Sequence, residues 1–353
     1  MKHSLANLVT SVAAFGLTVA TLELGIRIVD GVGFGLRNYV SYNLSLFASA
    51  YPSDYHPLLG YVPKPGYRGN WWHTRITINS SSLRQNRTDE TDHREYAILA
   101  VGDSYTFGDE VSDEETWPAQ LEKTTGLPVA NGGVFGYGLD QIVLRAETLV
   151  PVVRPLQLVV SFMFDDIYRN SLVQRTGVEK PYFDVVNSEL VLRNVPPSPN
   201  RPRIAQIGFL RAILGYSYLA DWSARRLRLS ARWYAGSFPA ARINTDGPLV
   251  ACLLMSRLKA LEVRAGIKTL VVAQYEDPFS EEERRVTANL LECAQKADLA
   301  TLDTRERLLA AYRETPSKFN KRYFGEGGHM SAAGNLLVAQ LITEWIKGPA
   351  LSP

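Results

Sequence analysis

The segment Ile98-Leu-Ala-Val-Gly-Asp-Ser-Tyr-Thr-Phe-Gly108 decides the predicted fold. The run from Tyr96 to Val101 is short, rich in apolar residues and ends at a glycine, which is typical of a buried strand. Ser104 then follows the carboxyl end of the strand, where a helix begins and its unpaired N–H groups point outward. Asp103 can accept hydrogen bonds from the local backbone. The segment is either a simple turn or the support of a nucleophilic serine.

A second segment, Gly325-Glu-Gly-Gly-His-Met-Ser-Ala-Ala-Gly-Asn335, favours the nucleophile. A serine nucleophile needs a base, and the base needs a carboxylate that orients it. Glu326 and His329 supply both groups within one loop, because three-residue spacing with two intervening glycines leaves them close enough to bond. We therefore expect Ser104, His329 and Glu326 to act together.

Between these two segments the sequence alternates between strand and helix patterns. Short apolar strands alternate with helical patterns, and the run 156–162 is apolar throughout, as a strand buried on both faces of a parallel sheet requires. Ligands bind at the carboxyl edge of such sheets, which is where Ser104, Asp165 and Asp166 are expected. The expected strands are 96–101, 127–131, 156–162, 267–273 and 299–302, and the expected helices are 117–125, 139–153, 249–265, 280–296, 304–314 and 332–347.

These ordered blocks resemble the SGNH (GDSL) hydrolases. The resemblance covers 95–348 and rests on Gly102-Asp103-Ser104, Asn131-Gly-Gly-Val-Phe-Gly136, Asp165-Asp166 and Glu326-x-x-His329. It implies a flavodoxin-like three-layer α/β/α domain with a parallel sheet, and an oxyanion hole formed by Ser104, Gly136 and position 165. The resemblance also implies that Ser104 is the nucleophile, His329 the base and Glu326 the residue that orients it.

The sequence departs from the family at two of these positions. Glu326 replaces the usual aspartate and can do the same work. Asp165 replaces an asparagine that donates an N–H to the oxyanion, and loss of one such donor costs about 100- to 1000-fold in rate. Activity then requires a protonated Asp165 or a substitute donor, and a non-catalytic glycan-binding protein of the same fold is the alternative. Asp166 is expected to stabilise a turn.

The amino terminus predicts a membrane helix. Leu5 to Leu22 contains no charged residue, and the apolar stretch continues to Ile28, which approaches the length that spans a bilayer. We expect a transmembrane anchor at 4–28, with a cleaved signal peptide as the alternative. Lys2 before the span and Arg27 and Arg37 after it do not fix the orientation. The resemblance to SGNH hydrolases implies that the catalytic domain lies outside the cytoplasm, in the periplasm.

Two further segments flank or interrupt the α/β domain. The aromatic-rich stretch 29–94 is expected to pack on the domain, with a strand at 74–79 and a structural role for His56. The stretch 171–246 is expected to be a helical insertion, and its long helical pattern at 209–234 carries several arginines beside apolar residues. Such a helix suits a lid over the active site, or a surface helix on anionic lipid.

Composition narrows the remaining possibilities. A net charge of +2 argues against a polyanion-binding protein, so no nucleic acid partner is expected. No metal-ligand cluster is present, and the glycines of 132–138 lack the Lys-Ser/Thr of a nucleotide loop, so we expect no metal and no cofactor. Cys252 and Cys293 lie on apolar helical patterns and are expected to be buried free thiols.

Together these patterns predict a membrane-anchored serine esterase that acts on acyl groups of a glycan or lipid. Water would release the acyl-enzyme. If a sugar hydroxyl takes the acyl group instead, the protein is an O-acyltransferase for a cell-surface polysaccharide, and the two outcomes share every residue named above.

Overall fold

The structure is a computed structural model of the chain. It describes residues 2–35, 38–39, 52–71, 74–87, 95–175, 178–199, 209–227, 233, 246–325 and 328–348. The chain forms two compact units: one combines 1–51 with 201–240, and the other combines 52–200 with 241–353. The larger unit contains the α/β domain and the candidate site.

A five-stranded parallel sheet is the centre of the larger unit. Its order from one edge to the other is β6-β5-β7-β12-β13. If these five strands are numbered by their sequence order, this is 2-1-3-4-5, the flavodoxin-like order. All five expected strands are present, and β5 is buried at every residue. The strands are β5 (Ile98–Val101), β6 (Val129–Asn131), β7 (Gln157–Phe162), β12 (Lys268–Ala273) and β13 (Ala300–Asp303).

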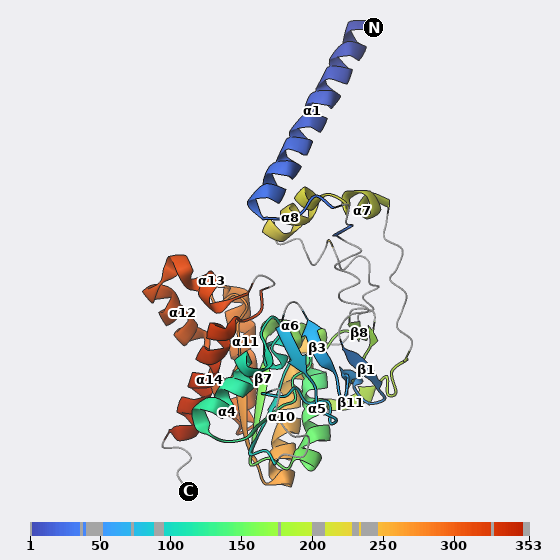
Figure 1. The fold of residues 1–353 in the computed structure, drawn as a ribbon. Coiled ribbons are helices and arrows are strands. Elements are labelled where there is room, and N and C mark those ends of the chain that lie inside the picture. Colours follow the sequence, from blue (N-terminus) through green and yellow to red (C-terminus); the bar gives the residue numbers. More distant parts are fainter. Residues whose placement is uncertain are drawn as a thin grey trace. The chain divides into compact units, whose positions relative to one another are not determined.

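Helices cover both faces of this sheet, which confirms the three-layer prediction. The helices α4 and α14 pack on each other, whereas α10 contacts both α5 and α11 (Figure 1). Strands buried on both faces need such cover because their side chains are apolar in both directions. These helices are α4 (Trp117–Thr125), α5 (Leu139–Val153), α10 (Gly247–Ala265), α11 (Glu281–Lys296) and α14 (Ala332–Lys347), and the connections add η1 (Asp113–Glu115), α12 (Arg305–Glu314), η2 (Pro316–Lys318) and α13 (Phe319–Tyr323).

The segment before the sheet is divided: 29–35 and 38–39 belong to the smaller unit, and 40–51 and 88–94 lie outside the described residues. The part at 52–71 and 74–87 packs on the α/β domain, as expected for the whole segment. It forms two hairpins, β1 (Ser53–His56) with β2 (Gly60–Pro63) and β3 (Arg68–Trp71) with β4 (Thr74–Thr77). Leu59, Tyr61, Ile76 and Ile78 are buried. The ring Nδ1 of His56 accepts the N–H groups of Leu58 and Leu59 at 3.2 Å, so His56 has a structural role.

Arg84 is the residue of this segment that matters most for the site. Its guanidinium is fully buried, pairs with Asp113 at 3.1 Å, and donates to the carbonyls of Phe107, Gly108 and Val111. Burial lowers the pKa of Arg84, and Asp113 opposes that effect. Arg84 therefore fixes the loop that follows Ser104.

The insertion differs from the expectation of a wholly helical segment. Within 174–193 two pairs of antiparallel strands form, and the turn of the second pair, at Asn187 and Ser188, takes the left-handed backbone. The hairpins join β8 (Gln174–Arg175) with β9 (Val178–Glu179), and β10 (Tyr182–Val186) with β11 (Glu189–Arg193). The expected long helix is also divided, into α7 (Phe209–Leu214) and α8 (Tyr218–Arg226), where the amide of Asn38 donates to the carbonyl of Ala212 and the N–H of Tyr39 donates to the carbonyl of Gly215. Positions 228–232 and 234 of that expected helix lie outside the described residues.

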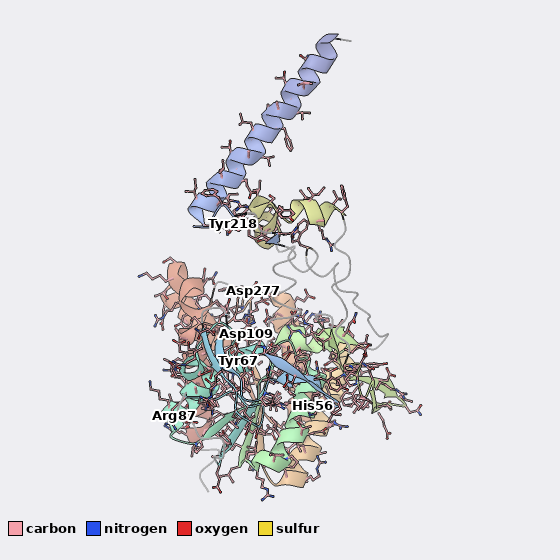
Figure 2. The ribbon with its side chains drawn as sticks, turned by 45° about the vertical axis from the view of Figure 1, so that its right-hand side comes forward. His56, Tyr67, Arg87, Asp109, Tyr218 and Asp277 are labelled. Carbon is pink, nitrogen blue, oxygen red and sulfur yellow. A yellow bond between two sulfur atoms is a disulfide. The ribbon has the colours of Figure 1, made fainter. Side chains whose placement is uncertain are left out.

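The smaller unit joins α7 and α8 to the amino-terminal helix α1 (Lys2–Val29). The Glu23 carboxylate accepts hydrogen bonds from the hydroxyl of Ser217 and the N–H groups of Tyr218 and Leu219, so it caps α8. The Arg27 guanidinium lies 5.9 Å from the ring centroid of Tyr218, beside the carboxyl-terminal end of α1 (Figure 2). The last two turns of α1 therefore hold the start of α8.

The two cysteines correct a prediction. Cys252 on α10 and Cys293 on α11 form a disulfide, and their Cα atoms are 5.3 Å apart. Neither residue is fully buried. The helical patterns placed each cysteine on an apolar face, but only the packing of α10 on α11 brings the two together.

Candidate active site

Ser104 lies where the sequence predicts, directly after β5. It begins the short helix α3 (Ser104–Phe107), and the Asp103 carboxylate accepts the N–H of Tyr105 at 2.9 Å. Gly102 is required here, since a Cβ at this position would lie 2.1 Å from the hydroxyl oxygen of Thr106. The tight exit from the sheet thus fixes the direction of the Ser104 side chain.

His329 comes from a compact loop before α14. Phe324 and Met330 form an isolated antiparallel β-bridge, and the N–H of Gly325 donates to the carbonyl of His329 at 2.7 Å. The amide of Asn335 donates to the carbonyl of Met330, while its oxygen accepts the N–H of Trp117 at 2.8 Å. Asn335 therefore ties the histidine loop to α4, which agrees with its expected packing role.

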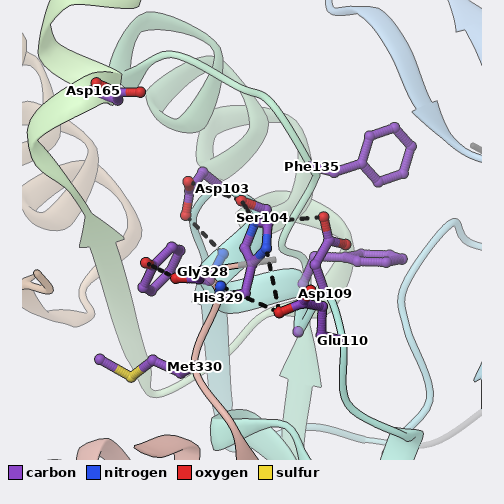
Figure 3. A network of polar contacts seen from close by, with 12 residues as sticks. Asp103, Ser104, Asp109, Glu110, Phe135, Asp165, Gly328, His329 and Met330 are labelled. Atoms are coloured by element: carbon purple, nitrogen blue, oxygen red, sulfur yellow. Dashed lines mark hydrogen bonds and ion pairs between the residues drawn. The ribbon is translucent and has the colours of Figure 1, made fainter. Parts of the chain in front are cut away.

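The two loops meet. The Nε2 atom of His329 lies 3.0 Å from Oγ of Ser104, within hydrogen-bond distance (Figure 3). The Tyr105 hydroxyl donates to the carbonyl of Gly328 at 2.9 Å, and its ring packs 5.5 Å from that of His329. The single hydroxyl proton of Ser104 is also within reach of Asp103 Oδ2, at 3.3 Å. Glu326 lies outside the described residues.

Two acidic residues that sequence reasoning did not single out approach His329 from the loop after α3. Asp109 Oδ2 is 3.7 Å from Nε2, and Glu110 Oε2 is 4.0 Å from Nδ1 (Figure 3). Glu110 Oε2 also accepts the backbone N–H of His329 at 3.3 Å. The sequence offered one signal for Asp109 and Glu110: they directly follow Gly108, in the loop beside the nucleophile.

The loop that carries Gly136 is held beside this network. Gly136 has φ of +71°, and the N–H of Val134 donates to the carbonyl of Gly102 at 3.0 Å. The buried Tyr61 hydroxyl donates to the carbonyl of Phe135 at 2.8 Å, and the Tyr137 hydroxyl donates to the carbonyl of Tyr61. Burial raises the pKa of Tyr61. The hairpin before the sheet thus braces the expected oxyanion loop.

Asp165 and Asp166 follow β7 on α6 (Phe164–Arg169) and have different environments. Asp166 is buried, accepts the N–H of Met163 at 3.0 Å, and pairs with Arg169 at 2.6 Å, so it stabilises the turn as expected. Burial raises the pKa of Asp166, and nearby Asp103 raises it further. The Asp165 side chain is 53% exposed and lies 3.5 Å from Arg169. In Figure 3 Asp165 lies apart from the dashed contacts around Ser104.

Two charged residues near the site come from elements that the sequence analysis passed over. Arg175 lies beside Gly136, since a Cβ on that glycine would be 4.0 Å from the Arg175 Nε atom, and burial lowers the pKa of Arg175 to about 10. Glu276 follows β12 at the carboxyl edge and approaches Gly328. Burial raises the pKa of Glu276, and Asp165 adds to that effect. Glu276 could have been predicted as Asp165 was, because it also follows a strand at the carboxyl edge of the sheet, where ligands bind.

Among the residues that the structure describes, no group of three or more His, Cys, Asp or Glu side chains could hold a metal ion. The arrangement brings together a hydroxyl, an imidazole and several carboxylates. These are the groups of nucleophilic and general acid–base chemistry.

No family model and no curated protein matches the chain. Solved structures do align with it. A protein of the G-D-S-L lipolytic family from Desulfitobacterium hafniense is 12% identical over 70% of this chain and 97% of its own, with a TM-score of 0.35. A lipase/acylhydrolase from Enterococcus faecalis is 16% identical over 71% and 95%, with a TM-score of 0.39. An acetylxylan esterase from Geobacillus stearothermophilus is 11% identical over 73% and 96%, with a TM-score of 0.38.

Proposed function

We propose that this chain is a serine hydrolase of the SGNH type that cleaves carboxyl esters. The observation that carries the proposal is the 3.0 Å distance between Ser104 Oγ and His329 Nε2. A hydroxyl is a poor nucleophile at neutral pH, and an imidazole at this distance can take its proton during attack on a carbonyl. The order of motifs that resembles SGNH hydrolases gives independent support.

In the proposed mechanism Ser104 Oγ attacks the ester carbonyl while His329 takes the hydroxyl proton. His329 then gives this proton to the leaving alcohol, and an acyl-serine remains. Water, deprotonated by His329, attacks the acyl-serine and releases the carboxylic acid. The roles of Ser104 and His329 require contact with the reacting atoms, whereas Glu326 is proposed to orient the imidazole.

The negative charge of the tetrahedral intermediate requires N–H donors. The backbone N–H of Ser104, in the first turn of α3, and that of Gly136 are the proposed donors, in line with the family pattern. Asp165 takes the third position of that pattern. A carboxylate accepts hydrogen bonds only and a carboxylic acid has one O–H donor, so Asp165 does not reproduce the amide N–H of the family's asparagine.

Two features support an anchored enzyme with its catalytic unit outside the cytoplasm. Val9–Val29 within α1 is long and apolar enough to cross a membrane, and it is the one such helix among the described residues. The Cys252–Cys293 disulfide suits an oxidising compartment. Because Glu23 of α1 caps α8 in the insertion, we propose that α1 is retained as the anchor. The substrate is then an acyl group on a glycan or lipid near the membrane.

The insertion is proposed to lie at the surface of that membrane. Helix α7 exposes Phe209, Leu210 and Ile213, and the carbonyl of the adjoining Gly215 accepts the N–H of Tyr39, just beyond the end of α1. Apolar side chains held at the end of a membrane span are favoured at the lipid interface. A spin label at Ile213 in nanodiscs should therefore be more accessible to oxygen than to a soluble nickel chelate. A label at exposed Val263 on α10 should show the reverse, and equal behaviour at both positions would contradict this placement.

Turnover of esters tests the proposed activity. The full-length protein in detergent should hydrolyse nitrophenyl esters, and S104A and H329A should each lose about 1000-fold or more of the rate. T301A is the matched control, because Thr301 lies on the edge strand β13 and loses only an exposed hydrogen bond from Gln295. Ester turnover that persists in S104A would contradict the proposal. Adding an oligosaccharide acceptor divides the two fates of the acyl-serine: acylated sugar indicates a transferase, and free acid alone indicates a hydrolase.

A further inference from the structure

Glu110 has a backbone that is unfavourable for its residue type. Its φ is +67°, in the left-handed region that glycine adopts freely and that a side chain rarely occupies. The surrounding loop is fixed by Arg84, which donates to the carbonyls of Gly108 and Val111 on either side. Residues held in such strained conformations cluster at functional sites. A glycine would relieve the strain, so the glutamate side chain needs an explanation.

The side chain of Glu110 reaches the histidine loop and shapes it. Its Oε2 atom accepts the backbone N–H of His329 at 3.3 Å. The same oxygen lies so close to Gly325 that a Cβ there would be 2.4 Å away, so a larger residue at this position would displace the carboxylate. The carboxylate is largely shielded from solvent, with 12% of the side chain exposed. Glu110 thus contacts both ends of the turn that carries the base.

The carboxylate also lies beside the imidazole. Oε2 is 4.0 Å from Nδ1, the ring nitrogen that faces away from Ser104. Among the described residues Nδ1 has no hydrogen-bond partner. The distance exceeds a hydrogen bond, yet an opposite charge within about 4–6 Å favours the charged form of a titrating group. Asp109 is near Nε2 instead, at 3.7 Å, on the side where Ser104 lies.

We propose that Glu110 is a positioning residue for His329, an inference that rests on the proposed function. Its carboxylate holds the backbone of the histidine turn and favours the imidazolium that forms when His329 takes the proton of Ser104. This role is separate from that of Glu326, and it explains why a strained glutamate stands where glycine would be more stable.

Three variants test this proposal by the rate of labelling with a fluorophosphonate, which needs no knowledge of the substrate. E110Q keeps the shape and removes the charge, and should label about tenfold more slowly. E110G removes the carboxylate together with the strain, so it should label at least as slowly as E110Q. The control R154G relieves a similar left-handed residue on the exposed end of α5, so it should melt higher and label at the wild-type rate.

A measurement of the contact itself separates positioning from a structural role. In E110Q the labelling rate should fall while the melting temperature stays close to that of the wild type, and the backbone amide resonance of His329 should move because its N–H loses the carboxylate acceptor. An unchanged amide resonance of His329, or labelling of E110Q at the wild-type rate, would overturn the proposal for Glu110. Absence of labelling in the wild type would instead overturn the proposed hydrolase function, and the amide resonance would still decide whether Glu110 holds the histidine turn.

Discussion

The imidazole of His329 and the hydroxyl of Ser104 lie 3.0 Å apart although 225 positions separate them in the chain. The sheet explains the distance. Ser104 follows β5, one of the interior strands, and Asn335 ties the loop of His329 to the start of α4, which follows α3 and η1 along the chain. Both residues are therefore fixed by the segment that runs from β5 to α4.

Replacement of Asp165 by asparagine should raise the rate of ester turnover. The amide restores an N–H donor and removes a negative charge, and one such donor is worth about 100- to 1000-fold where it is well placed. D165N is compared by kcat/KM with D184N, which breaks the exposed ion pair of Asp184 with Arg193 and should leave the rate unchanged. A lower rate in D165N would show that the carboxylate itself is needed.

The hydroxyl of Tyr61 should support catalysis from outside the α/β domain. Y61F removes the buried hydrogen bond to the carbonyl of Phe135, which costs about 1 kcal/mol of stability and loosens the loop that carries Gly136. We expect turnover to fall by up to about tenfold. Tyr55 in the same hairpin donates to Pro197 at a half-exposed position, so Y55F is the control. Equal rates for Y61F and Y55F would contradict the bracing role.

Stability should depend on pH through Glu283. Its carboxylate accepts the N–H groups of Glu276 and Asp277, and burial raises its pKa from 4.5 to about 7. A group whose pKa is raised by folding stabilises the protein fully below its unfolded pKa and loses that contribution as the pH rises through the folded value. The melting temperature should therefore fall between pH 5 and pH 8.

E283Q should remove most of this fall, since the amide stays neutral at every pH in the range. E314Q, on the exposed surface of α12, should keep the wild-type profile. Parallel melting curves for E283Q and the wild type from pH 5 to pH 8 would show that Glu283 does not titrate in this range.

The disulfide should contribute strongly to stability. It joins residues separated by 41 positions, and closing a loop of that length is worth about 4 kcal/mol by chain entropy. C252S/C293S should therefore melt at a clearly lower temperature. In intact cells the wild-type cysteines should react with a maleimide only after reduction, and ready reaction without a reductant would contradict an oxidising compartment.

The sequence predicted the sheet well because its strands are short apolar runs between longer helical patterns. Each of the five expected strands overlaps an observed one. The start of the expected helix at Ser280 is confirmed: the Ser280 hydroxyl accepts the N–H of Glu283, while the Glu283 carboxylate accepts N–H groups of the loop before the helix. Local patterns fix where a helix begins, and tertiary contacts decide what its first side chains bind.

Contacts that depend on long-range packing could not be predicted. The disulfide requires α10 beside α11, and Gly215, at the break after α7, lies against Asn38, 177 positions earlier. Glu110 illustrates the same limit at the site. Nothing in its neighbours signals a left-handed backbone at a glutamate, and its partner His329 is 219 positions away.

Mapping the adduct of a fluorophosphonate by mass spectrometry tests the pairing of Ser104 with His329 most directly. Our account predicts one adduct, on the peptide that contains Ser104, which is absent in S104A and at least about 100-fold slower to form in H329A. An adduct on another residue, or labelling of H329A at the wild-type rate, would contradict it.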